Sequence, residues 1–128
     1  MTTYGGAMLE IARGRKEGHW IWYIFPQIEG LGSSDAVKLY SIKSLEEGRA
    51  YLEHLVLGPR LIKACEILLN LKDSSMDEVM GFPDDLKLLS SMTLFEALSD
   101  SNSIFTKIID VYFDNERDES SIKIIKAT

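Results

Sequence analysis

The chain has 128 residues, of which 45% are hydrophobic and 27% charged, and its formal net charge is −6. This composition is that of an ordinary single globular domain, so it excludes a disordered, collagen-like or disulfide-stapled chain. The longest apolar run, Trp20 to Phe25, has six residues, whereas a membrane helix needs about 20.

Helical signals appear early in the chain. Residues 1–6 are expected to be frayed, and residues 7–17 have helical spacing that ends at Gly18. An aromatic stretch, 19–27, is followed by a predicted loop over 28–34 and a short helix ending at Tyr40. Ser44 and Glu47 form a capping-box pattern, which predicts a helix to about His54.

The second half continues the helical pattern. Pro59 predicts the start of a helix whose apolar stripe reaches residue 69, and Ser75 with Glu78 forms a second capping box. That short helix should end at Gly81, and Pro83 then opens a helix to about residue 98. Two further helices are predicted over 104–112 and 118–127, the last with Ile122 and Ile125 inward. We therefore predict an all-α fold, a compact single-domain bundle of about six or seven short helices without repeats.

The first candidate site is the aromatic segment, defined as residues 14–27, which holds both tryptophans of the chain. Adjacent cations suit a phosphate or carboxylate, an imidazole transfers protons near neutral pH, and indoles stack on flat rings. The alternative is that the aromatic side chains are simply core. The candidates are Arg15, Lys16, Trp20, Trp22 and Gln27 for binding and His19 for catalysis.

The second candidate site is the serine-rich segment, defined as residues 83–95. On a helix, Asp84, Lys87 and Ser91 share one face, and Ser90 and Thr93 add two more hydroxyls nearby. These groups could line a pocket whose other wall is the aromatic segment. The alternative is a local ion pair and hydroxyls that serve helix packing.

The remaining reactive residues favour structural roles. His54 is expected at a helix end, where an imidazolium suits the dipole, and Cys65 lies on an apolar stripe as an inert core thiol. Two histidines far apart in sequence and one cysteine predict no metal site. No dinucleotide fingerprint or phosphate loop is present, so no cofactor is expected.

Charge distribution bears on the possible partners. Residues 73–119 contain three Lys/Arg and twelve Asp/Glu, a local charge of −9. Because such a stretch repels phosphate backbones, we expect no nucleic-acid partner. No basic segment followed by an apolar stretch opens the chain, and a lone cysteine fits a reducing compartment, so we expect a cytoplasmic protein without a membrane partner.

Several motifs follow one another in a fixed order. They are residues 15–16 with 19–27, residues 30–32 with Ser34, Ala36 and Tyr40, and residues 57–61, 83–87 and 90–95. Together they resemble the bacterial family catalogued as domain of unknown function 1810. The resemblance covers nearly the whole chain and implies a mainly helical fold without an established activity. Some members carry the label calpastatin, which does not fit, because that animal inhibitor is a disordered repeat protein.

Three positions depart from the pattern that the resemblance implies. The stretch before the first motif is short, Leu55 stands where a proline is typical, and Leu89 stands where an arginine is typical. If that arginine served a ligand, the site of this chain is weakened; if it was a surface cation, nothing changes.

These observations support two functional hypotheses. The first is a pocket for a small anionic ligand, nucleotide-like in its chemistry, with enzymatic turnover left open. The second is a non-catalytic protein–protein interaction module, or a homo-oligomer, that uses the aromatic segment as its interface. Both are compatible with a monomer or a homodimer, and a purely structural role for both segments is the third option.

Overall fold

The computed structural model describes residues 3–31, 39–71 and 73–127. Eight helices are present in these residues, and six of them have nine residues or more. Apart from one isolated parallel bridge between Ile28 and Ile42, the described residues contain no β-structure. The all-α prediction is confirmed. The helices are α1 (Tyr4–Ala12), α2 (Ile21–Ile24), α4 (Leu45–Glu53), α5 (Leu57–Leu69), α6 (Met76–Met80), α7 (Asp84–Ala97), α8 (Ile104–Tyr112) and α9 (Glu119–Ala127).

Local capping signals account for most of the observed helix boundaries. The Ser75–Glu78 capping box is complete, and Gly81 ends α6 with φ 78°. At α4, Ser44 accepts the Glu47 amide as predicted, but the Glu47 carboxylate accepts from the amide of Lys43, 3.1 Å away. Helix α7 begins directly after Pro83, as expected.

Other boundaries differ from the prediction. Thr3 caps α1 by accepting the Gly6 amide, so the expectation of fraying is wrong for residues 4–6. The same helix ends at Ala12, and residues 13–17 lie outside it. The predicted short helix ending at Tyr40 falls largely outside the described residues. In α9, Ile122, Ile124 and Ile125 are all partly buried, and Ile125 packs against the core as predicted, together with Ile124.

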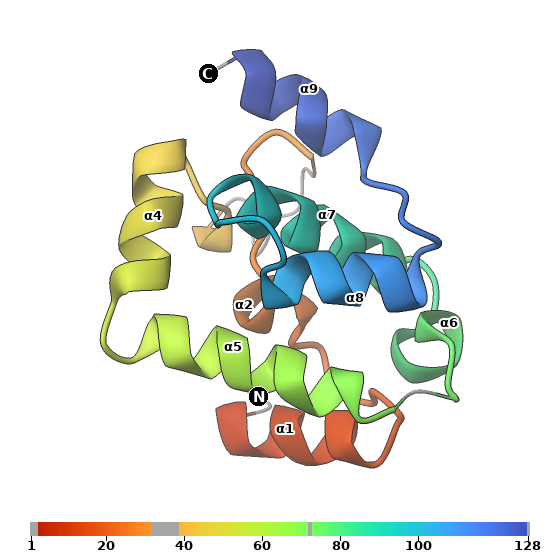
Figure 1. Cartoon of the computed structure of the whole chain (residues 1–128). Coiled ribbons are helices and arrows are strands. Elements are labelled where there is room, and N and C mark those ends of the chain that lie inside the picture. Colours follow the sequence, from red (N-terminus) through yellow and green to blue (C-terminus); the bar gives the residue numbers. More distant parts are fainter. Residues whose placement is uncertain (1–2, 32–38, 72, 128) are drawn as a thin grey trace.

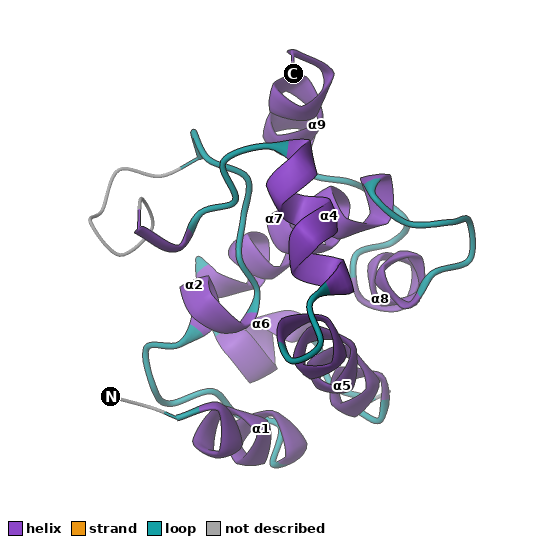
Figure 2. Cartoon of the chain, turned by 90° about the vertical axis from the view of Figure 1, so that its left-hand side faces the viewer, coloured by secondary structure: helices purple, strands orange, loops and turns teal. Residues whose placement is uncertain are grey.

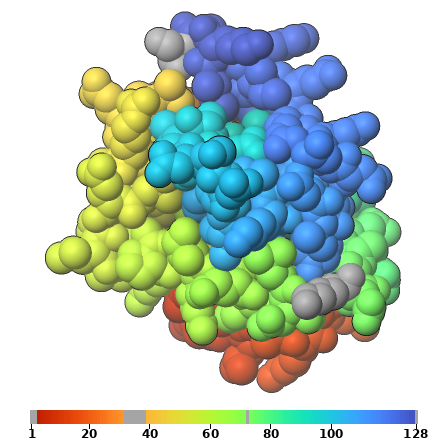
Figure 3. All heavy atoms as spheres, viewed as in Figure 1, coloured from red at the N-terminus to blue at the C-terminus, as the bar shows by residue number. Residues whose placement is uncertain are grey.

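Helices α5 and α7 organise the packing (Figure 1). Helix α7 contacts α2, α6, α8 and α9, while α5 contacts α1, α4 and α8. Helix α1 lies at one end of the molecule and α9 at the opposite end, as a second view shows (Figure 2). The space-filling view shows α5 and α8 closely packed between these two ends (Figure 3). Among the described residues, no helix is long and apolar enough to cross a membrane.

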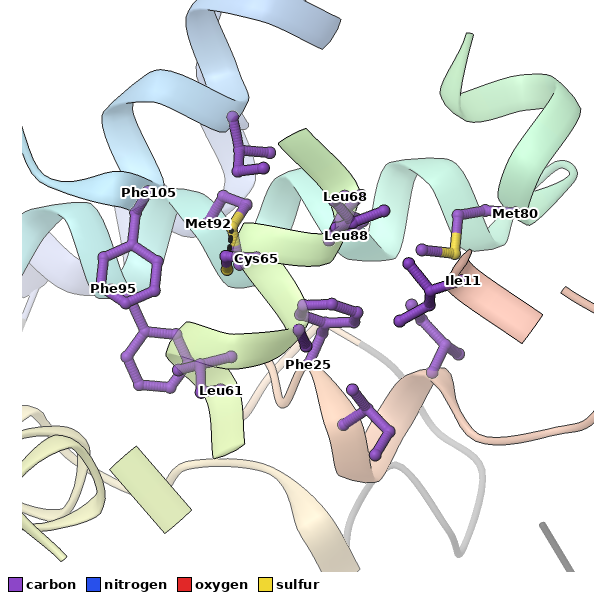
Figure 4. Close-up of a cluster of buried hydrophobic side chains, with 14 of the residues drawn as sticks. Ile11, Phe25, Leu61, Cys65, Leu68, Met80, Leu88, Met92, Phe95 and Phe105 are labelled. Carbon is purple, nitrogen blue, oxygen red and sulfur yellow. Dashed lines mark hydrogen bonds between the residues drawn. The ribbon is translucent and has the colours of Figure 1, made fainter. Parts of the chain in front are cut away.

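The core forms between α5 and α7 (Figure 4). Cys65 of α5 meets Met92 of α7 at a sulfur–sulfur distance of 3.7 Å, and both side chains are fully buried. Burial raises the pKa of the Cys65 thiol far above its usual range, which agrees with an inert core thiol. Phe95 and Phe105 extend the core toward α8 with ring centroids 5.6 Å apart.

Two polar contacts extend the sequence-based interpretation. His54 is the C-cap residue of α4, as expected from the sequence, and its Nδ1 also accepts the amides of Val56 and Leu57, at 3.1 and 3.2 Å, at the start of α5. Arg117 donates two hydrogen bonds to Glu96 of α7, at 2.9 and 2.6 Å. This fork fixes the chain just before α9 against α7.

Gly58 allows a close approach between the start of α5 and the backbone of α4. A Cβ atom at this position would lie 2.1 Å from the carbonyl oxygen of Leu52. Because the obstacle is backbone, the connection between α4 and α5 has to move if any side chain is added.

We expect Gly58→Ala to lower the free energy of unfolding by about 1–3 kcal/mol, the usual cost of overpacking. Gly5→Ala is the matched control, because no atom lies within 4 Å of its Cβ position and alanine favours a helix by about 0.5–1 kcal/mol. Urea unfolding followed by circular dichroism measures both. Equal stability of Gly58→Ala and the parent chain would contradict the close approach.

Candidate functional site

Lys16 is a structural cation inside the aromatic segment. Its Nζ lies 2.7 Å from Oδ2 of Asp84, donates to the Gly18 carbonyl at 2.6 Å and sits 5.3 Å from the centroid of the Trp20 ring. The Lys16 side chain is only 6% exposed. Lys16 is therefore held by contacts within the fold, and its role in holding a ligand stays a prediction. The neighbouring Arg15 is exposed and has no ion pair among the described residues.

Glu10 of α1 is a structural residue that the sequence did not reveal. Its Oε1 accepts hydrogen bonds from the amides of Glu17 and Gly18 and from Nε1 of Trp20, at 2.7–2.8 Å. Burial raises the pKa of this carboxyl, but the three hydrogen bonds and the Lys16 charge outweigh it, and the net pKa lies below the usual value. Glu10 therefore holds residues 17–20 against α1, while Lys16 ties the same segment to α7.

The aromatic side chains divide between core and surface. Trp20 and Phe25 are fully buried, so the core interpretation is right for Trp20, which cannot stack on a ligand. Trp22 is half-buried and packs on Tyr40, with ring centroids 4.6 Å apart. His19 is exposed.

A groove brings parts of the two predicted segments together. It has a volume of about 220 Å³ and lies between the end of the aromatic segment, the first half of α7 and the start of α9. Of the predicted residues, Gln27, Lys87 and Ser90 line it, whereas Arg15, His19, Trp22 and Asp84 are not among its lining residues. The lining residues are Gln27, Leu31, Pro83, Leu86, Lys87, Ser90, Asp118 and Ser120.

Asp84 sets the charge beside this groove. Its carboxylate lies 2.7 Å from the ammonium of Lys16 and 3.4 Å from that of Lys87. The side chain of Asp84 is 20% exposed and that of Lys87 33% exposed. One carboxylate thus pairs with two ammonium groups, and Lys87 is the more accessible of the two. Among the lining residues, Lys87 carries the positive charge and Asp118 the negative charge.

Asp118 lines the groove from the position just before α9. Its Oδ2 accepts from the amide and hydroxyl of Ser121, at 3.0 and 2.5 Å, and from the Ser90 hydroxyl at 3.1 Å. Thr93 donates to the Leu89 carbonyl and accepts the Asp118 amide, so it is a packing hydroxyl. The spacing before 119–127 suggests a helix cap at Asp118, but nothing in the sequence points to its contact with Ser90.

Ser91 differs from its neighbours. It is fully buried, and its Oγ is the one buried side-chain polar atom without a hydrogen-bond partner among the described residues. It does not line the groove. No group of three or more potential metal ligands occurs in the described part of the chain.

Comparison with known proteins identifies a family. A family model described as "Protein of unknown function (DUF1810)" matches residues 1–125. The crystal structure of the conserved hypothetical protein Rv1873 from Mycobacterium tuberculosis is similar, with a TM-score of 0.95 and 42% sequence identity over 98% of this chain and 89% of that one. No curated protein matches the chain.

The adjacent cations Arg15 and Lys16 should respond differently to the same substitution. We expect Lys16→Met to lower the free energy of unfolding by about 2 kcal/mol, because charged hydrogen bonds are lost from a buried site. Arg15→Met is the matched control and should change it by less than about 0.5 kcal/mol. Chemical unfolding of both variants measures the difference, and equal losses would contradict the buried role of Lys16.

Glu10 should make stability depend on pH in the acidic range. Its folded pKa is lowered from 4.5, so the unfolded chain binds the proton more readily, and the stabilisation present at neutral pH is lost as the pH falls through the folded pKa. We expect the stability difference between the parent chain and Glu10→Gln to shrink from pH 7 to pH 3. A difference that stays constant over this range in urea titrations would show that the carboxylate charge contributes nothing.

Proposed function

The chain belongs to the DUF1810 family, and because the description of that family assigns no function, we propose one from the site itself: the groove binds a small anionic ligand through Lys87. The observation that carries this proposal is the shared carboxylate of Asp84, which pairs with both Lys16 and Lys87. Lys16 is the closer and more deeply buried partner. Because Asp84 is shared with Lys16, the ammonium group of Lys87 can interact with a further negative charge. A ligand anion would supply that charge without having to break a fully formed ion pair.

The other lining groups suit the rest of such a ligand. Gln27 contributes an amide and Ser120 a hydroxyl, while Leu31, Pro83 and Leu86 offer apolar contacts. Asp118 is the one lining carboxylate in the described residues, and its Oδ2 already accepts three hydrogen bonds at the start of α9. Because a helix N-terminus offsets negative charge, Asp118 opposes an anion less than a free carboxylate would.

The groove volume limits the ligand. A volume of about 220 Å³ lies below the roughly 300–1,000 Å³ typical of drug-sized sites. A small phosphate ester or dicarboxylate fits better than a dinucleotide, and base stacking on Trp20 is not part of the proposal because that ring is buried. His19 does not line the groove, so we propose binding, and turnover stays a prediction.

The remaining expectations complete this proposal. The protein binds this ligand in the cytoplasm as a monomer or homodimer, and it binds neither nucleic acid nor a membrane. The alternative of an interaction module built on the aromatic segment is weakened by burial, since Trp20, Ile21, Ile24 and Phe25 all belong to the core.

Isothermal titration with inorganic phosphate, small sugar phosphates, dicarboxylates and nucleoside monophosphates tests the proposal. We expect saturable binding of at least one anion, weakened about tenfold or more in Lys87→Ala, because a charge-assisted hydrogen bond is lost. Lys63→Ala, which removes an exposed lysine from α5, is the matched control and should bind like the parent chain.

Two results would overturn the groove as an anion site. The first is the absence of heat from every anion in the panel at millimolar concentration. The second is unchanged affinity in Lys87→Ala when its thermal midpoint shows that the variant is folded.

A further inference from the structure

A second, smaller hollow is lined by residues of α1, α2, α4 and α5, and it shares no lining residue with the groove. Its volume is about 60 Å³. Three tyrosine rings, Tyr4, Tyr23 and Tyr51, line it together with Arg60 and the aliphatic side chains of Ile24 and Leu61. Three of its lining residues, Leu57, Arg60 and Leu61, belong to the motif at 57–61, which the proposed function does not use.

Arg60 provides the one formal charge among the lining residues. Its guanidinium lies 4.7 Å from the centroid of the Tyr4 ring, and the Tyr4 hydroxyl donates to the Arg60 carbonyl at 3.2 Å. Within the part of the chain that the structure describes, no carboxylate lies within ion-pair distance of this guanidinium. Its fork of N–H donors is thus available to a ligand.

The tyrosines do not offset this charge. Burial raises the pKa of Tyr51 to about 12, against the smaller lowering effect of Arg60, and burial also raises the pKa of Tyr4 and Tyr23. All three phenols are therefore neutral near pH 7. The hollow combines one uncompensated guanidinium with walls of aromatic and aliphatic carbon.

We propose that this hollow is a binding site for a small monocarboxylate with an apolar body. The guanidinium of Arg60 matches a carboxylate in a two-point fork, and the rings and aliphatic side chains cover the body of the acid. One water needs about 10–15 Å³ of such volume, so 60 Å³ holds a ligand of about four to six non-hydrogen atoms. Inorganic phosphate suits the hollow less well, because a strongly hydrated dianion loses more on contact with apolar walls.

Propionate and isobutyrate are the probes, and the amides of the same two acids are the matched controls. We expect both acids to shift the ring resonances of Tyr51 in NMR spectra in a saturable way, and the uncharged amides to produce no saturable shift. Arg60→Lys, which keeps the charge but loses the fork, should weaken binding about tenfold. Lys87→Ala should bind these acids like the parent chain, which separates this site from the groove.

Three outcomes would overturn the proposal. They are the absence of a saturable shift with either acid up to solubility, amides that bind as tightly as the acids, and an Arg60→Lys variant with unchanged affinity. If inorganic phosphate binds more tightly than both acids, the assignment of a carboxylate ligand is also wrong. Circular dichroism of Arg60→Lys confirms that a loss of binding does not come from unfolding.

Discussion

The carboxylate of Asp84 is held between two ammonium groups, and both the buried tryptophan and the groove depend on that arrangement. Lys16 binds Asp84 from the segment after α1 and at the same time lies over the ring of Trp20. Lys87 binds the same carboxylate from one turn further along α7. Asp84 is the first residue of α7, where the helix dipole favours a negative charge. One anion therefore fixes the aromatic segment against α7 and leaves Lys87 facing the groove.

The sequence was sufficient to predict a helix boundary wherever that boundary depends only on residues close to it in the chain. The serine at position 75 and the glutamate at 78 complete a capping box, and Gly81 adopts a positive φ that few other residues tolerate. The end of α1 could not be predicted in this way. It depends on Glu10, whose carboxylate accepts amides seven and eight residues later, and no helix-periodicity rule describes such a contact.

Residue types indicated three of the eight residues that line the groove, and tertiary contacts determined the rest. Gln27, Lys87 and Ser90 were predicted from their chemistry and do line the groove. Arg15 and Lys16 were indistinguishable in sequence, yet of the two only Lys16 forms an ion pair with Asp84. Asp118 was missed because Ser90 and Thr93, its partners, lie 28 and 25 positions away in the chain.

The groove and the smaller hollow differ in what an anion must displace. Lys87 in the groove already has an ion-pair partner, whereas Arg60 in the hollow has none within the described residues. Lys87 already forms an ion pair with Asp84, so a ligand in the groove has to weaken that ion pair or bind beside it. Arg60 lies against a tyrosine ring without a carboxylate within the described residues, so a ligand there breaks no existing ion pair. The Tyr51 ring also packs on Phe95, at 5.5 Å between centroids. A ligand beside Tyr51 therefore contacts the aromatic core directly, whereas a ligand beside Lys87 contacts mainly helix ends and the polar surface around them.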